Sequence, residues 1–333
     1  MLETITFLGY GSWSAALCNV LAHKGYDVTA WHRNQDIIDE MVRTKCHYLI
    51  QDLKIHPEIN ILSTDSELPE TSSIVVIGVP CQSFRYLVKQ FKAVLSTAEH
   101  IAYISKGIET GTLATMSEIL FEELGTIKNV ICLSGPSHAE EVNLRYPTML
   151  VSSSIQLSNS KLIQRIFSTD LLRVYTNEDI KGVELGGAIK NVIAIAAGFC
   201  DGINLGDNTK AALMTRGMLE IARLGIKMGA DPNTFSGLSG FGDLFVTCSS
   251  KHSRNRKLGQ SIGEGVGLSD IIDESSMVAE GVQTSRSVYK LSRKHDVELP
   301  ICEAVYKVLF EELDPHQAIK SLMTRKLKEE RFS

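Results

Sequence analysis

Lys190 is the residue whose type and surroundings most strongly indicate chemistry. It lies in an apolar, glycine- and alanine-rich segment, residues 182–198, in which only Glu184 and Lys190 carry charge. Such a segment predicts a helix that is packed on nearly all sides. Burial of an ammonium group there is costly unless the group is paired or its pKa falls. Lysines of this kind often serve in acid–base chemistry.

Two later segments contain polar residues that could act together with Lys190. Three glycines precede Asp243, so the backbone can turn sharply and bring this carboxylate into a crowded place; the alternative is a simple turn-forming aspartate. Ser253 can cap a helix whose free N–H groups, together with Arg254 and Asn255, would suit a phosphate. The alternative is an exposed basic first turn, although the helix dipole disfavours basic residues at that end.

A dinucleotide-binding unit is predicted at the N-terminus. A short apolar strand is followed by Gly9 and Gly11, then by a helix over residues 15–23 and a second strand over residues 27–31. Gly9 permits the tight turn, and Gly11 lets the backbone approach a pyrophosphate at the helix N-terminus. Ser14 replaces the third glycine of this fingerprint but is still small. An ordinary strand–turn–helix is the alternative interpretation.

The residues after the second strand indicate the type of cofactor. An NAD-selective site usually has an acidic residue there, which bonds the ribose 2′-hydroxyl. This chain instead has His32, Arg33 and Asn34. Arg33 could pair with a 2′-phosphate, so NADP(H) is favoured, with NAD(H) as the alternative. The alternative is that Arg33 is a solvated loop residue without a role in cofactor binding.

Strands and helices alternate through the first half of the chain, and helical patterns alone follow. Further strands are predicted at residues 73–79, 100–105, 129–133, 148–153 and 172–175. Ligands of open α/β sheets bind beyond the carboxyl ends of strands, so Pro80, Lys106 and Gly135 should line one crevice with the glycine turn. We therefore predict an α/β, Rossmann-like doubly wound dinucleotide-binding domain (residues 1–177), followed by an all-α substrate and catalytic domain (residues 178–333).

Composition narrows the classes of function. The 333 residues, 44% of them hydrophobic, suit two domains, and the net charge of −5 gives no basic field for nucleic acid. Seven scattered cysteines without a C-x-x-C pair predict reduced, mostly buried thiols and no metal site. No apolar run is expected to span a membrane, which takes about 20 residues. No signal peptide is predicted, so the cytoplasm is the default compartment.

Together these motifs resemble the bacterial NAD(P)-dependent glycerol-3-phosphate dehydrogenase family over essentially the whole chain. The most specific part of the resemblance is the lysine–asparagine helix followed by a Ser-Arg-Asn turn. The matching motifs are Gly9-x-Gly11-Ser12-Trp13, Ser105-Lys106-Gly107, Leu133-Ser134-Gly135-Pro136-Ser137, Leu185-Gly186-Gly187-Ala188-x-Lys190-Asn191-Val192, Gly240-x-Gly242-Asp243-Leu244, Ser253-Arg254-Asn255 and Glu280-Gly281.

The resemblance implies a homodimer that reduces dihydroxyacetone phosphate to sn-glycerol 3-phosphate by hydride transfer, for glycerophospholipid synthesis. It implies that Lys190 donates and accepts the proton, aided by Lys106, Asn191 and Asp243. The implied substrate contacts are Lys106, Gly135, Ser137, Lys190, Asp243, Ser253, Arg254 and Asn255. The expected cofactor contacts are Gly9, Gly11, Ser12, Trp13, Arg33, Lys106, Ala139, Arg254 and Glu280.

Two departures and two rival interpretations remain. Tyr10 and Ser14 stand where the family usually has Ala and Gly, which puts cofactor affinity in question. One rival is a β-hydroxyacid or 6-phosphogluconate-type dehydrogenase, in which the lysine and asparagine are typically a helical turn apart rather than adjacent. The other is a non-catalytic NADP(H)-binding regulatory protein, which would need the cofactor crevice but not Lys190, Asp243 and Arg254 together.

Overall fold

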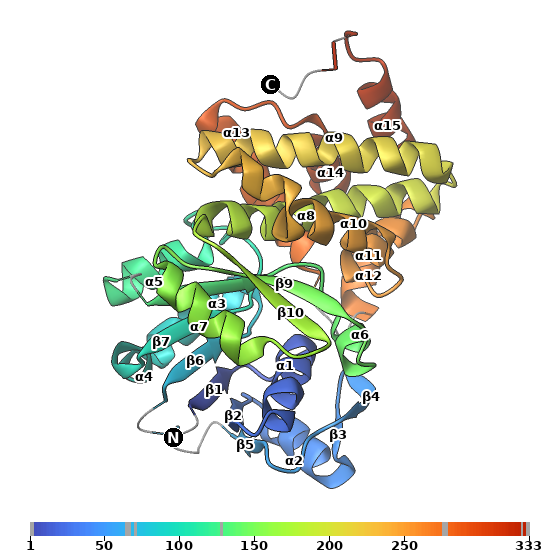
Figure 1. The fold of residues 1–333 in the computed structure, drawn as a ribbon. Coiled ribbons are helices and arrows are strands. Elements are labelled where there is room, and N and C mark those ends of the chain that lie inside the picture. The colour runs from blue at the N-terminus through green and yellow to red at the C-terminus, as the bar shows by residue number, and fades with distance from the viewer. Residues whose placement is uncertain are drawn as a thin grey trace. The chain divides into compact units, whose positions relative to one another are not determined.

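The chain forms two compact units (Figure 1). A computed structural model describes residues 3–63, 68–69, 72–126, 129–274, 279–327 and 329–330. Unit 1 comprises Met1–Ser105 and Met116–Ile180, and unit 2 comprises Lys106–Thr115 and Lys181–Ser333. The first unit therefore contains most of the N-terminal half, apart from a ten-residue segment that belongs to the second.

The division differs in two ways from the predicted boundary after residue 177. It falls between Ile180 and Lys181, and Lys106–Thr115 belong to unit 2. Ile108 explains the second difference, because its side chain is fully buried in the core of unit 2 and its carbonyl accepts a hydrogen bond of 3.0 Å from Ser287 Oγ. The separate cofactor and substrate roles of the two domains stay a prediction.

Unit 1 is built on an eight-stranded sheet with the strand order β10-β9-β8-β7-β6-β1-β2-β5. The strands are β1 (Thr4–Leu8), β2 (Asp27–Trp31), β5 (Asn60–Leu62), β6 (Ile74–Ile77), β7 (His100–Tyr103), β8 (Val130–Ser134), β9 (Thr148–Ser153) and β10 (Leu172–Asn177). All neighbours are parallel except β8 and β9. Every residue of β6 and β8 is buried, as expected for strands covered on both faces.

Helices follow the strands of this sheet in both directions from β1. They are α1 (Ser12–His23), α2 (Gln35–Thr44), α3 (Cys81–Gln90), α4 (Lys92–Thr97), α5 (Met116–Leu124), α6 (Ala139–Asn143) and α7 (Leu157–Phe167). Helix α1 contacts α6 and α7, whereas α3 and α4 contact α5. Right-handed crossovers that run in opposite directions from the centre of a sheet place their helices on opposite faces. The predicted Rossmann-like, doubly wound class is therefore confirmed.

The antiparallel pairing of β9 with β8 was not predicted. Their connection contains only the five-residue helix α6. A helix of this length covers about 7 Å, whereas a five-residue strand spans about 16 Å. The parallel connections from β1 to β2 and from β9 to β10 contain the longer helices α1 and α7, whereas β9, which follows α6, runs opposite to β8.

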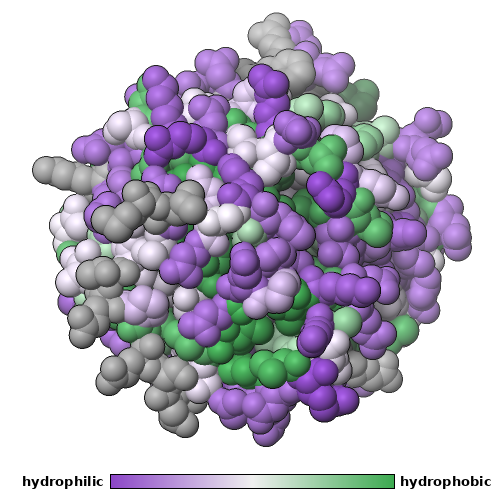
Figure 2. All heavy atoms as spheres, turned by 60° about the horizontal axis from the view of Figure 1, so that its bottom comes forward, coloured by the Kyte–Doolittle hydropathy of each residue, from purple (hydrophilic) through white to green (hydrophobic). Residues whose placement is uncertain are grey.

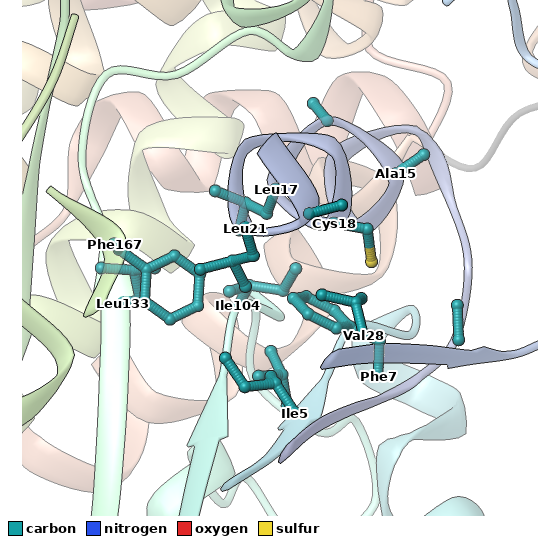
Figure 3. Packing of buried hydrophobic residues seen from close by; sticks show 14 of the residues in the cluster. Ile5, Phe7, Ala15, Leu17, Cys18, Leu21, Val28, Ile104, Leu133 and Phe167 are labelled. Carbon is teal, nitrogen blue, oxygen red and sulfur yellow. The ribbon is translucent and has the colours of Figure 1, made fainter. Parts of the chain in front are cut away.

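The core of unit 1 fixes α1 against the sheet. Leu17, Cys18 and Leu21 project from α1 toward strand side chains that include Phe7 and Val28 (Figure 3). All five side chains are fully buried. This packing sets the position of the α1 N-terminus beside the glycine turn, where the sequence predicts a cofactor phosphate.

A small hairpin next to the glycine turn was also not predicted. It pairs β3 (Cys46–His47) with β4 (Ile50–Lys54) in antiparallel fashion. Its strands are short and carry polar residues, so they lack the apolar run that marked the strands of the main sheet. His47 and Leu53 are nevertheless fully buried.

Unit 2 is helical in its described part, apart from loops and turns, as predicted. Its helices are α8 (Ile180–Gly202), α9 (Gly206–Lys227), η1 (Pro232–Ser236), η2 (Leu238–Gly242), α10 (Asp243–Ser249), α11 (Arg254–Gly263), α12 (Leu268–Glu274), α13 (Glu280–His295), α14 (Pro300–Phe310) and α15 (Pro315–Met323). Helix α8 is at the centre of the core, because nearly all its side chains are buried.

Helix α8 also has the length and apolar composition of a membrane-spanning helix, and its apolar window is fully buried inside the protein. We predicted that no apolar run was long enough to span a membrane; α8 passes such a test by its length and composition alone. Glu184 and Lys190 interrupt the run without ending the helix. The core helix of a water-soluble domain meets the same length and hydropathy criterion as a membrane span.

The state of the cysteines and the mixed polarity of the surface are those expected from the composition. No disulfide joins any of the seven cysteines, and all except Cys46 are buried, as predicted. Figure 2 shows one face of the molecule, on which hydrophilic atoms predominate and a hydrophobic area lies among them. Such a mixture is ordinary, because much of any folded surface is apolar.

Candidate active site

Two ammonium groups and one carboxylate meet inside unit 2. Lys190 Nζ, from the middle of α8, donates to Oδ1 of Asp243, the first residue of α10, and to Thr247 Oγ1 at 2.8 Å. Lys106 Nζ donates to the other carboxylate oxygen of Asp243 at 2.7 Å. Asp243 is only 1% exposed and Lys190 6%. The carboxylate therefore joins two lysines that are far apart in the sequence.

Glycines allow Asp243 to reach Lys190. A Cβ atom at Gly186 of α8 would lie 2.7 Å from the carbonyl oxygen of Ser239, and one at Gly240 would lie 2.2 Å from the carbonyl oxygen of Phe235. Real Cβ atoms do not approach backbone this closely, so only glycine lets α8, η1 and η2 pack together. The prediction that glycines deliver Asp243 into a crowded place is confirmed by its burial.

Burial and charge act in opposite directions on Lys190. Burial lowers its pKa, nearby Asp243 raises it and the second ammonium of Lys106 lowers it, with the result that the pKa falls from 10.5 to about 8. The sequence could not tell which effect is larger. In the structure the effect of burial is the larger one. Lys190 is therefore mainly protonated near neutral pH and readily becomes neutral slightly above it.

Asn191 belongs to a buried amide network. Its Oδ1 accepts a hydrogen bond of 3.0 Å from Asn255 Nδ2, and Asn255 Oδ1 accepts one of 2.9 Å from the backbone N–H of Gly281. The network joins α8, α11 and α13 at the residues that the resemblance singled out. The predicted contacts of Asn191 and Asn255 with substrate stay predictions.

Helix α11 presents the expected cap and basic residue. Ser253 Oγ accepts a hydrogen bond of 3.2 Å from the N–H of Arg256, so Ser253 is the predicted N-cap. Arg254 is exposed at the first position of the helix. Capping by Ser253 leaves other N–H groups of the first turn available for an anion.

A glycine seam, formed by Gly198 and Gly202 of α8 with Gly259 and Gly263 of α11, holds these two helices close together. A Cβ atom at Gly198 would lie 2.1 Å from the Arg256 carbonyl oxygen, and one at Gly259 would lie equally close to the Ile195 carbonyl oxygen. The seam fixes α11, which presents Arg254, against the helix that carries Lys190.

The glycine turn of unit 1 has the shape that a pyrophosphate needs. Gly9 has φ +102°, and a Cβ atom there would lie 2.6 Å from the Gly78 carbonyl oxygen. Gly11 precedes α1, whose N-terminus receives no side-chain cap, and a Cβ atom at Gly11 would have no atom within 4 Å. Ser12 and Trp13 begin the helix and are partly exposed. An open, uncapped helix N-terminus fits an anionic ligand.

The two departures in this turn do not obstruct it. Tyr10 is completely buried, so its ring points into the protein core. Ser14 is buried against the strand end, where a Cβ atom at Gly78 would lie 2.2 Å from Ser14 Oγ. The glycine missing at position 14 is thus compensated by one at position 78.

The other predicted contacts in unit 1 follow strand ends. Arg33 is exposed after β2. Gly135 follows β8 with φ +126°, and a Cβ atom there would lie 3.2 Å from Leu150 Cα, so glycine is required. Ser137 Oγ donates to the Gly135 carbonyl oxygen at 3.0 Å, and Ala139 begins α6. Glu280, by contrast, begins α13 in unit 2.

Sequence reasoning missed Thr247. Its hydroxyl accepts from Lys190 Nζ and donates to the Asp243 carbonyl oxygen at 2.6 Å, so it orients the lysine. The signal was present, because residues four apart on a helix share a face. The helix that begins at Asp243, α10, was not predicted, so the spacing could not be assigned to a helix face.

Comparison with known proteins gives matches along the whole chain. Residues 4–160 match the family model for the NAD-dependent glycerol-3-phosphate dehydrogenase N-terminus, and residues 179–320 match the model for its C-terminus. Glycerol-3-phosphate dehydrogenase [NAD(P)+] 2 from Salinibacter ruber is 46% identical over 335 aligned residues, covering 100% of this chain and 97% of its own length. Glycerol-3-phosphate dehydrogenase [NAD(P)+] from Carboxydothermus hydrogenoformans is 47% identical, with 98% of each chain covered.

A solved structure gives the same result. The crystal structure of glycerol-3-phosphate dehydrogenase from Coxiella burnetii is similar to this chain with a TM-score of 0.93 and 35% identity, and the match covers 97% of this chain and 99% of that one. Sequence and structure comparisons therefore agree over both units.

Proposed function

The chain belongs to the glycerol-3-phosphate dehydrogenase family, and on this basis we propose how its residues divide the work of the reaction. It is an NAD(P)-dependent oxidoreductase that acts on a CH–OH group. The reaction is the reversible reduction of dihydroxyacetone phosphate to sn-glycerol 3-phosphate. The observation that carries the proposal is the buried contact of Lys190 with Asp243.

The cofactor residues lie mainly in unit 1. Gly9, Gly11, Ser12 and Trp13 would hold the pyrophosphate at the uncapped start of α1. The exposed Arg33 would pair with a 2′-phosphate, which favours NADP(H) over NAD(H). When bound, the nicotinamide supplies the hydride. We also assign cofactor contacts to Ala139, Lys106, Arg254 and Glu280, on the basis of the family resemblance.

Lys190 handles the proton. As C2 of the ketone gains a hydride, negative charge develops on its oxygen, and the Lys190 ammonium donates a proton to form the alcohol. In the reverse direction, neutral Lys190 takes the alcohol proton as the hydride leaves C2. A pKa of about 8 suits both directions, because neither protonation state is rare near physiological pH.

Asp243 and Thr247 keep the ammonium in one orientation. The Asp243 carboxylate offers one oxygen to Lys190 and the other to Lys106, so it also places a second positive charge near the reacting oxygen. Asn191 is assigned to the same polarising role. Its amide is already oriented by Asn255.

The phosphate group aligns the substrate. Arg254, Asn255 and the start of α11, capped by Ser253, would hold it through charge and N–H groups. Gly135 and Ser137 are assigned as further substrate contacts from unit 1. Binding energy from the non-reacting phosphate then serves to orient the ketone for the hydride.

Reduction of dihydroxyacetone phosphate, followed by absorbance with NADPH and NADH in parallel, tests this function. We expect oxidation of either cofactor to depend on dihydroxyacetone phosphate, with higher kcat/KM for NADPH. Activity with a β-hydroxyacid or with 6-phosphogluconate instead would favour the rival dehydrogenase class. Cofactor binding without turnover of any of these substrates would favour the regulatory protein.

We further propose a cytoplasmic homodimer that supplies glycerophospholipid synthesis, as the family resemblance implies. Light scattering coupled to size-exclusion chromatography tests the oligomeric state. The mass measured across the elution peak should be twice the 36.7 kDa of one chain. A monomeric mass would remove the dimer from the proposal.

A further inference from the structure

A buried histidine in the β3–β4 hairpin holds the glycine turn of unit 1. His47 is only 1% exposed, and its Nε2 lies 3.1 Å from the carbonyl oxygen of Tyr10. Its Nδ1 lies 3.3 Å from the backbone nitrogen of Leu49. A carbonyl only accepts and a backbone N–H only donates. Nε2 therefore carries the proton and donates to Tyr10, while Nδ1 accepts from Leu49.

The same histidine also contacts the Tyr10 side chain. The two ring centroids lie 5.5 Å apart and the rings are nearly perpendicular, at 85°. This edge-to-face arrangement is favourable for aromatic rings. His47 thus contacts Tyr10 at two points, the carbonyl oxygen in the turn and the ring in the core.

The turn needs such support because glycine flanks Tyr10 on both sides. Gly9 and Gly11 lose more conformational freedom on ordering than other residues do. The Tyr10 hydroxyl makes no hydrogen bond within the described part of the chain, so the ring is held by packing alone. Burial lowers the pKa of His47 to about 4, which keeps the ring neutral and its hydrogen bonds unchanged near neutral pH.

We propose that His47 is a positioning residue for the dinucleotide: it holds Gly9-Tyr10-Gly11 in the conformation that receives the pyrophosphate. Binding then does not have to order the turn, so affinity increases through preorganisation. Tyr10, which replaces the usual alanine of the family, is the residue through which the hairpin acts. The inference rests on the proposed function, since it assumes a dinucleotide at this turn.

Because His47 contacts the turn that would bind the pyrophosphate, the inference predicts how its loss changes the affinities for NADH and NADPH. The pyrophosphate is common to NADH and NADPH, so loss of His47 should weaken both by the same factor. Arg33, by contrast, would contact only the 2′-phosphate. An equal loss for the two cofactors therefore distinguishes positioning of the turn from recognition of the 2′-phosphate.

The test measures dissociation constants of NADPH and NADH for the full chain without substrate, by quenching of protein fluorescence. His47→Leu keeps the bulk of the side chain but removes both nitrogens, and we expect both constants to rise about tenfold. The kcat at saturating cofactor and the KM for dihydroxyacetone phosphate should stay within about twofold of wild type, since Lys190 and Asp243 lie in unit 2. His47→Gln, whose amide N–H can reach the Tyr10 carbonyl, should recover most of the affinity.

His56 offers a matched control. It follows the same hairpin, its Nδ1 accepts from the backbone nitrogen of Glu58 at 3.3 Å, and its ring makes an edge contact with His23. His56→Leu should leave both dissociation constants unchanged, because the contacts of its ring with Glu58 and His23 do not involve the glycine turn.

Three results would overturn the inference: unchanged affinity in His47→Leu, unequal loss for NADPH and NADH, or no difference between the glutamine and leucine variants. If His47→Leu does not fold, His47→Asn replaces it, because its shorter amide cannot reach Tyr10; equal affinity of the asparagine and glutamine variants is then the contrary result. A wild-type chain that binds dinucleotides but does not reduce dihydroxyacetone phosphate contradicts the proposed function alone. A wild-type chain that binds neither dinucleotide contradicts both.

Discussion

The proposed chemistry depends on how one carboxylate, that of Asp243, is shared between two lysines. Lys190 is buried, yet its ammonium group donates hydrogen bonds to Asp243 and Thr247. The protonated form is therefore stable inside the protein and can still donate its proton. Lys106 takes the other carboxylate oxygen and opposes protonation of Lys190. The arrangement holds the lysine pKa between the value of a free lysine and neutrality.

This balance predicts opposite pH profiles for the two directions of the reaction. Reduction requires protonated Lys190, so its kcat/KM should fall as pH rises through about 8, whereas oxidation requires neutral Lys190 and should rise over the same range. Initial rates in both directions between pH 6 and 10 provide the measurement.

Asp243→Asn serves as the control for that profile. Asp243 raises the pKa of Lys190, so its neutralisation should move the inflection to lower pH, in addition to lowering the rate. Profiles that stay flat across the range, or an inflection that does not move in the variant, would argue against Lys190 as the titrating group.

Arg33 gives a second prediction at this scale. Arg33→Asp replaces a partner for the 2′-phosphate with a group that repels it and can bond a ribose hydroxyl. The ratio of kcat/KM for NADPH to that for NADH should fall at least about tenfold. Steady-state kinetics with each cofactor give the ratio, and a ratio equal to that of wild type would remove Arg33 from cofactor selection.

Charged residues in apolar or glycine-rich segments could be predicted as functional from the sequence. The polar residues that form hydrogen bonds with them or hold the nearby backbone could not. Lys190 stood out as a charge in an apolar helix, and Asp243 as a carboxylate after glycines. Thr247 and His47 are ordinary polar residues, and their roles depend on atoms brought together by tertiary structure. Neither spacing nor composition reveals the contact of His47, and the four-residue spacing of Thr247 from Asp243 is informative only once α10 is known to be a helix.

At the scale of elements, the close approach of α8 and α11 is the feature that would couple Lys190 to the proposed phosphate site at Arg254. The glycine seam brings backbone against backbone, and the Asn191–Asn255 hydrogen bond and the ion pair of Asp201 with Arg256 connect the same two helices. A shift of α11 would therefore move Arg254 relative to Lys190.

Gly259→Ala tests the seam. Its Cβ would lie 2.1 Å from the Ile195 carbonyl oxygen, a backbone atom that cannot move alone, so overpacking should cost about 1–3 kcal/mol of unfolding free energy. Urea denaturation measures this loss, and the KM for dihydroxyacetone phosphate should rise in the folded variant.

Gly217→Ala is the matched substitution on α9. Its Cβ would meet a methyl group of Ile193 at 2.7 Å, a side chain that can adjust, and α9 does not present Arg254. It should cost less than about 1 kcal/mol and leave the KM unchanged. Equal effects of the two alanines would show that the seam has no special role.

Elements with a continuous apolar pattern were predicted well, and those without one were not. The strands β2 and β9 begin and end at the predicted residues, and α8 differs from its prediction by a few residues at its ends. The hairpin β3–β4 escaped prediction because only Ile50 and Leu53 of β4 are buried, so the strand shows neither a continuous apolar run nor regular alternation. The antiparallel direction of β9 was not predicted either, because an apolar pattern marks a strand without specifying its direction.

At the scale of the whole molecule, the proposed proton donor and the proposed contacts to the pyrophosphate and the 2′-phosphate belong to different units. Lys190 lies in unit 2, and Gly9, Gly11 and Arg33 lie in unit 1. Lys190→Ala should therefore lower kcat by about 10²–10⁴-fold while the NADPH dissociation constant stays within about twofold. Near-normal turnover would refute the catalytic assignment, and a large loss of NADPH affinity would show that Lys190 also serves the cofactor.

The segment Lys106–Thr115 ties the stability of unit 2 to the first half of the sequence. Ile108 is completely buried in the core of unit 2, whereas Ile104, four residues earlier, is buried in the core of unit 1. Replacement of either isoleucine by alanine leaves a cavity that costs about 2–5 kcal/mol. Although the two isoleucines are only four residues apart in the sequence, the cavities that their replacement leaves should destabilise different units.

Hydrogen exchange followed by mass spectrometry can resolve this difference, because it reports stability peptide by peptide. Ile108→Ala should speed exchange in α8 and α13, while peptides from β1 and β6 keep their protection. Ile104→Ala should do the reverse. If both variants speed exchange in the same peptides, the chain unfolds as a single cooperative body, and the division at Ser105 and Lys106 has no energetic meaning. Separate responses would show that the chain crosses between cores directly before the lysine that pairs with Asp243.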